Sequence, residues 1–139
     1  LSSSSAASDV YKRQLLQSCA PKYSETTYVS NFSPYVKNGF SIYPVGTDLK
    51  TKNYTPLADL SIVFRIGEAP KGMKDNNELK KGQFSVITPT GEYMTKRLVE
   101  EAKIYGANAI VNFKITPVYR KATLHSYTVS GVAAEIEHK

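Results

Sequence analysis

Alternating apolar and polar residues mark four segments of this chain as β-strands. The clearest is LADLSIVFRIG, where β-branched and aromatic residues recur at every second position, as in a strand with one buried face. GFSIYPV alternates in the same way after a glycine, and two more alternating segments lie near the end of the chain. The predicted strands are Gly39–Val45, Leu57–Gly67, Ala109–Val118 and Ser126–Ile136.

A helical period separates the second and third of these strands. Within Thr90–Asn108, apolar residues recur every three to four positions, which gives a helix one apolar stripe. Thr90 suits the N-cap of this helix, and Gly106 suits its end because glycine adopts the left-handed backbone that closes a helix. The residues predicted to form the stripe are Tyr93 or Met94, Leu98, Ala102 and Tyr105.

The chain before the helix is less regular. Glu68–Gln83 is rich in Gly, Asn and Lys, which predicts a loop, and QFSVITPT (Gln83–Thr90) indicates a short strand leading into the helix. Gly131, inside the last strand, indicates a bulge or a close approach of a neighbouring segment. The order β-β-α-β-β predicts an α+β fold: a small antiparallel or mixed sheet of about four strands, with one main helix packed on it.

Length and composition agree with one folded domain. The chain has 139 residues, of which 41% are hydrophobic, and its ten Tyr and five Phe can form a core. Its net charge of +6 permits a surface that faces anionic lipid or polymer, but it is first of all the charge of an ordinary soluble domain. The lysines are scattered among acidic residues without an Arg-rich run, so no nucleic-acid partner is predicted. No run of about 18 or more apolar residues occurs.

The first fourteen residues differ from the rest of the chain. SSAASDVYKRQ (Ser4–Gln14) matches, residue for residue, the translation of a transposon-based sequencing adapter. Lys12 and Arg13 stand where a cleavable signal peptide would be most apolar, so a signal peptide does not explain the segment. We therefore interpret residues 1–14 as non-native and leave them out of the fold prediction.

LLQSC (Leu15–Cys19) resembles the end of a bacterial lipoprotein signal. Leu16 holds the apolar position, Ser18 the small one, and Cys19 would become the lipidated first residue of the mature protein. Gln17 departs from the commonest pattern, which has a small residue there. Several acyl chains on one cysteine make membrane attachment stable. The alternative is an ordinary free thiol, because one cysteine supports neither a disulfide framework nor a cysteine zinc cluster.

Candidate chemistry is sparse elsewhere in the sequence. The two histidines, His125 in a predicted loop and His138 near the end of the chain, lack the converging partners that a metal site needs. His125 is the only plausible general base, and no Ser elbow, phosphate loop or carboxylate pair accompanies it. Glu100 and Glu101 are interpreted as surface charges of the helix. We therefore predict no catalytic residues, no metal ligands and no cofactor.

The passage LVEEAKIYGANAIVNFKI, followed by SYTVSGVAAEI, resembles the YbjQ-like family, which is described as heavy-metal-binding. The positions that carry the resemblance are Glu101, Ala102, Gly106, Ala107, Asn108, Ala109, Gly131 and Ala133. Gly106 would end the helix and Gly131 would let the last strand pack closely, so the shared motif is structural. The passage is also similar to envelope lipoproteins of Gram-negative bacteria with a comparable helix exit. Glu68–Gln83 is an insertion relative to the compact family pattern.

The resemblance implies a small α+β domain that assembles into a ring, a pentamer formed by edge-strand pairing. Its metal label maps onto no ligand residues of this chain. We expect residues 15–19 to be the remnant of a lipoprotein signal, residues 20–38 a polar tether and residues 39–139 the YbjQ-like domain. The leading hypothesis is a non-enzymatic, lipid-anchored envelope domain for binding or sensing, whose protein partner is unknown. The alternative is a cytosolic homo-oligomeric ring that binds a metal or small ligand.

Overall fold

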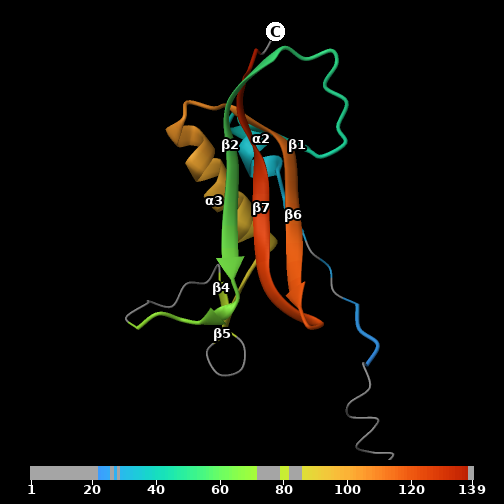
Figure 1. Ribbon diagram of the computed structural model, residues 1–139. Helices are drawn as coiled ribbons and strands as arrows, with labels where there is room; N and C mark the ends of the chain where they lie inside the picture. Colours follow the sequence, from blue (N-terminus) through green and yellow to red (C-terminus); the bar gives the residue numbers. More distant parts are fainter. Residues whose placement is uncertain (1–21, 26, 28, 72–78, 82–85, 138–139) are drawn as a thin grey trace, which may run out of the picture.

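The computed structural model describes residues 22–25, 27, 29–71, 79–81 and 86–137, and it confirms the predicted α+β fold (Figure 1). The four longest predicted segments, three strands and the helix, form close to their predicted positions. The elements are α2 (Ser33–Lys37), β1 (Ser41–Pro44), β2 (Tyr54–Arg65), β3 (Gly67–Glu68), β4 (Leu79–Lys81), β5 (Val86–Pro89), α3 (Gly91–Ile104), β6 (Ala109–Arg120) and β7 (Thr123–Ile136).

The main sheet is mixed and has the strand order β1-β6-β7-β2. β1 runs parallel to β6, while β6 with β7 and β7 with β2 are antiparallel. A second sheet, with the order β3-β5-β4, lies below the N-terminus of α3 in Figure 1. The sequence predicted a loop for most of this region, because strands of two to four residues are too short to show a period.

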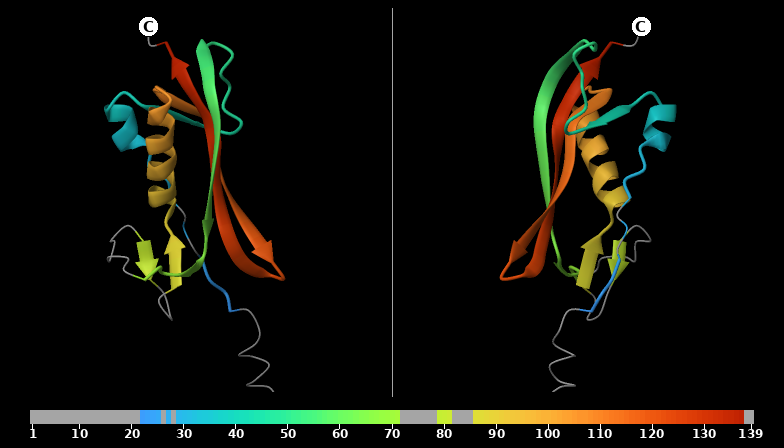
Figure 2. Two further views of the ribbon diagram at one scale, coloured as in Figure 1. Left: turned by 60° about the vertical axis from the view of Figure 1, so that its left-hand side comes forward. Right: turned by 90° about the vertical axis from the view of Figure 1, so that its right-hand side faces the viewer.

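Helix α3 covers one face of the main sheet (Figure 2). Its N-cap is Thr90, as predicted, whose Oγ1 accepts a hydrogen bond from the Tyr93 N–H at 3.1 Å. The prediction for Tyr105 is wrong: this residue follows the helix as its C-cap and is 52% exposed. The buried helix residues are Met94, Thr95, Leu98, Val99 and Ala102.

The folded part begins before Gly39. Residues 20–38 were expected to be a polar tether, but Phe32 and Tyr35 pack against the core. The rings of Phe32 and Phe113 meet edge to face with centroids 5.3 Å apart. Short helix α2 therefore belongs to the domain, because aromatic side chains bury a large area that a tether would leave in water.

Part of the opposite sheet face is also buried. Ala109, Val111, Ala134 and Ile136 are at most 4% exposed but lie outside the cluster that packs around α3. The connection from β1 to β2 runs along this side of the sheet, away from the helix (Figure 2). The crossover that carries the chain between the two edges of the sheet thus lies beside this second apolar cluster.

Gly131 marks a close approach, as its place inside a strand indicated. A Cβ built on Gly131 would lie 2.4 Å from Ile110 Cγ2 and 3.3 Å from the Val111 carbonyl oxygen. Both neighbours belong to β6, so the β6–β7 pair can pack under α3 only without a side chain at this position. The bulge itself lies in β6, where the register shifts between Val111 and Lys114.

Asn108 joins the start of β6 to the end of β7. Its Nδ2 donates a hydrogen bond to the Ile136 carbonyl at 2.9 Å, and its Oδ1 accepts one from the Ile136 N–H at 2.7 Å. The Asn108 N–H donates to the Ala134 carbonyl at 3.1 Å, and its carbonyl accepts from the Ser41 N–H at 3.0 Å. One residue therefore holds β1, β6 and β7 in register.

Replacing Asn108 with alanine should destabilise the domain by about 1–3 kcal/mol, because the polar backbone groups of buried Ile136 lose both side-chain partners. Urea unfolding followed by circular dichroism measures this difference. Asn53→Ala, at an exposed position, is the matched control and should change stability by no more than about 0.5 kcal/mol. Equal stability of the two variants would contradict the role assigned to the Asn108 side chain.

Candidate functional site

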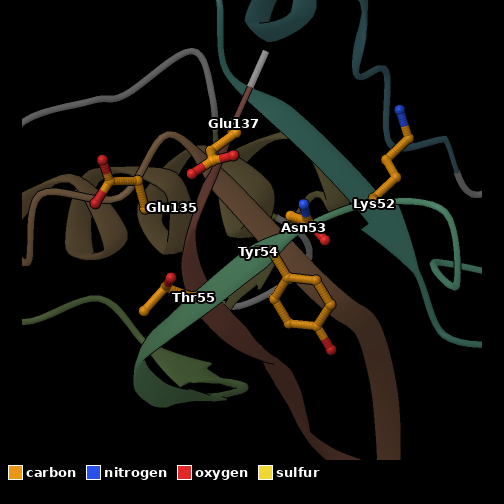
Figure 3. A pocket seen from close by; sticks show the side chains of 6 residues that line it. All are labelled: Lys52, Asn53, Tyr54, Thr55, Glu135 and Glu137. Atoms are coloured by element: carbon orange, nitrogen blue, oxygen red, sulfur yellow. The ribbon is translucent and has the colours of Figure 1, made fainter. Parts of the chain in front are cut away.

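A shallow hollow lies where β2 begins and β7 ends (Figure 3). Its volume is about 340 Å³, and two of its lining residues are joined by a hydrogen bond that the Glu137 N–H donates to the Asn53 carbonyl at 3.3 Å. In Figure 3 the side chain of Tyr54 points away from those of Thr55 and Glu135, and the side chain of Lys52 points away from that of Tyr54. The polar groups diverge, so they do not form a convergent set of ligands. The lining residues are Lys52, Asn53, Tyr54, Thr55, Glu135 and Glu137.

No group of three or more His, Cys, Asp or Glu side chains that could hold a metal ion occurs among the described residues. Glu100 and Glu101 are both paired with Arg97, whose guanidinium lies 2.7 Å from Glu100 and 3.2 Å from Glu101. These pairs follow helical spacing on a partly exposed surface, where they add little to stability.

His125 lies in β7 and not in a loop, which corrects the sequence-based prediction. The β6–β7 hairpin is longer than expected because a two-residue turn, Lys121–Ala122, joins the strands with φ angles of 49° and 64°. Such positive φ values match the twist of a tight hairpin. The turn lacks the Asn-Gly or Asp-Gly pair that would reveal it in the sequence.

The surroundings of His125 favour its neutral form. Burial is the largest effect that lowers its pKa from 6.5, followed by the charges of Arg120 and Arg65. Its Nε2 is buried and has no hydrogen-bond partner in the described part of the chain. Its Nδ1 lies 3.4 Å from the Ser126 hydroxyl.

This Ser–His contact is poorly suited to nucleophilic catalysis. Ser126 is only 3% exposed, so a substrate could hardly reach its hydroxyl. A general-base histidine must also become positively charged during the reaction, and catalytic triads stabilise that charge with a carboxylate. Two arginines act on His125 instead, and they disfavour the charged form.

Cationic side chains gather at the end of the sheet where the β6–β7 hairpin turns. Arg65 in β2 and Val118 in β6 both pair with Ser126 in β7, which lies between these two strands. Paired residues of neighbouring strands point to the same face, so the three share one face of the sheet. Arg120 follows Val118 by two residues on the same strand, and Lys121 opens the turn. We define the hairpin end as the exposed residues Arg65, Val118, Tyr119, Arg120 and Lys121.

None of the five residues of the hairpin end is acidic, and the acidic residue nearest to them in the sequence is Glu68, three residues after Arg65. Neither residues 60–67 nor residues 109–134 contain an Asp or Glu. Charge counting along the sequence missed this cluster because Arg65 is far from Arg120 in the chain. Strand pairing brings the two arginines to the same end of the sheet. The sequence feature that could have revealed the cluster was the absence of acidic residues from both segments.

No family model, curated protein or solved structure matches this chain. The YbjQ-like resemblance therefore stays a hypothesis that depends on the residues alone. In the structure, Gly106 has a φ of 79° after the end of α3, Ala107 and Ala109 are buried, and Asn108 and Gly131 make the strand contacts described above. These five residues thus lie at the junction of the helix and the sheet.

Cys19, the candidate for lipidation, lies outside the described residues. No helix in the described part of the chain is long and apolar enough to cross a membrane.

His125 should make stability depend on pH. Its folded pKa is lower than its unfolded value of 6.5, so the unfolded chain binds more protons at mildly acidic pH. The contribution of neutral His125 to the free energy of unfolding should be fully present above about pH 6.5. It should decrease as the pH falls towards the folded pKa. Thermal unfolding midpoints of the wild type and His125→Gln across this range measure the effect, and the variant should lose part of the slope. His138→Gln, which changes the chain's other histidine, is the control; a slope lost only in that variant would contradict the prediction.

Proposed function

We propose that this chain is a non-enzymatic, lipid-anchored domain of a Gram-negative cell envelope that binds or senses a component of that compartment. The observation that carries the proposal is LLQSC, with Cys19 at the position of lipidation and polar residues after it. Lipidation would tether the domain from its N-terminal side.

The course of the chain after Cys19 supports this proposal. Lys22–Glu25 are exposed, and among the residues that the structure describes the first side chain packed on the core is Phe32. The intervening residues could bridge the distance from a bilayer surface to the domain.

The character of the described surface supports binding over catalysis. Its hollow at the start of β2 has diverging polar groups, and its one Ser–His contact is buried beside two arginines. The surface feature with a single, consistent chemistry is the cationic hairpin end.

Lipidation at Cys19 can be tested directly. The gene, with the natural codons upstream of Leu15 determined from source DNA, is expressed in a Gram-negative host fed with an alkyne-labelled fatty acid. The expected product carries the label and fractionates with membranes, while Cys19→Ser carries none.

Ser18→Ala is the matched control for this experiment, because alanine is also small and should leave labelling intact. An unlabelled wild-type protein that stays in the soluble fraction would overturn the proposal.

The alternative, a cytosolic homo-oligomeric ring that binds a metal or small ligand, is favoured by one observation. β2 is an edge strand of twelve residues, and its Val63 is 64% exposed. Long edge strands can pair with a second copy of the same chain.

If this alternative holds, light scattering after size exclusion should give a closed oligomer whose mass is a whole multiple of 15.4 kDa. Val63→Lys should reduce that mass, because a lysine on an edge strand opposes pairing. Titration with Zn²⁺ should show binding in proportion to protomers that is lost in His125→Gln. A monomer that binds no metal would contradict the alternative.

A further inference from the structure

The N-terminal segment and the hairpin end lie at the same end of the molecule. Val29 and Ser30 lie against the start of α3: a Cβ built on Gly91 would be 2.8 Å from the Val29 carbonyl oxygen and 3.1 Å from the Ser30 hydroxyl. Further towards the N-terminus, Lys22–Glu25 lie at the end of the molecule where β6 turns into β7, in both views of Figure 2.

Cys19 precedes this segment by three residues in the sequence. A bilayer that held the chain on the N-terminal side of Lys22–Glu25 would lie nearer the β6–β7 turn than the opposite end of the sheet, where β2 begins.

The hairpin end has the chemistry of a surface that contacts anionic lipid. Arg65, Arg120 and Lys121 are exposed, and residues 60–67 and 109–134 contain no Asp or Glu. Cations held near a negatively charged bilayer gain attraction over about a Debye length, roughly 8–10 Å at physiological salt. A hairpin that turns towards the bilayer would bring these side chains within that range.

Exposed apolar groups accompany these charges. Tyr119, which directly precedes Arg120, is 62% exposed, and Val118 is 37% exposed. Tyrosine favours the boundary between water and lipid, because its ring is apolar and its hydroxyl remains solvated.

We propose that the hairpin end is a membrane-docking surface that binds the anionic headgroups of a phospholipid bilayer and orients the domain on it. In the cell this contact would act together with the lipid anchor proposed at Cys19, on which its orienting role rests. The docking itself depends on the hairpin and its cations, so the unlipidated chain must show it.

The test uses the full chain with Cys19→Ser, so that no acyl group contributes. Sedimentation measures its binding to vesicles of phosphatidylethanolamine and phosphatidylglycerol, and to vesicles of phosphatidylcholine alone. We expect binding to the anionic vesicles only, and weaker binding as salt is raised. Arg120→Gln with Lys121→Gln should weaken it by roughly tenfold or more, since each surface cation contributes about a fivefold gain in affinity.

Lys50→Gln with Lys52→Gln is the matched control. It removes the same charge from the exposed connection between β1 and β2, at the opposite end of the sheet. It should leave binding within about twofold of the starting protein. Equal losses in the two double variants would overturn the proposal, since they would show attraction to net charge without a docking surface. No binding to anionic vesicles, or equal binding to phosphatidylcholine, would also overturn it.

These results are separate from the labelling of Cys19. A labelled protein whose hairpin variant binds vesicles as well as its parent refutes the docking surface and leaves the anchor. An unlabelled protein that binds anionic vesicles through the hairpin refutes the anchor and leaves the docking surface.

Discussion

The amide of Asn108 holds together segments on which the rest of the domain depends. Its side chain binds both backbone polar groups of Ile136, while its own backbone pairs with Ala134 and Ser41. These bonds set the register at one end of the sheet, where three strands meet the end of α3. Because a strand shifted by one residue turns every side chain to the opposite face, this register decides which residues reach the core.

Close packing under the helix follows from that register. It places Gly131 beside Ile110, and a side chain at Gly131 would collide with the Ile110 methyl group. Leu98 of α3 also comes within 3.6 Å of a Cβ built at Gly131, so helix and sheet touch where the strand is smallest. The motif that resembles the YbjQ-like family thus supports packing at a helix–sheet junction, and its residues provide no chemistry for catalysis.

The unequal lengths of the strands shape the surface that we assign to docking. β1 pairs with β6 only as far as Phe113, whereas β6 and β7 continue to the pair Arg120 and Thr123. The hairpin therefore extends beyond β1 and beyond the helix, and the side chains of Val118 to Lys121 remain exposed. The charges of Arg120 and Arg65 also act on His125, where they lower its pKa and so oppose the positive charge that a general base must take on.

The sequence by itself determined the elements with a sustained period: the two-residue alternation of four strands, the stripe of α3, its Thr90 cap and its end at Gly106. These are local patterns, in which each residue reports the face on which it lies. Only the tertiary structure decided the parallel pairing of β1 with β6, the packing of Phe32 on the core and the three-stranded second sheet. It alone also brought Arg65 to the end of the sheet that carries Arg120. Pairing between distant strands depends on contacts that no local period encodes, and this is why the cationic hairpin end had to be found in three dimensions.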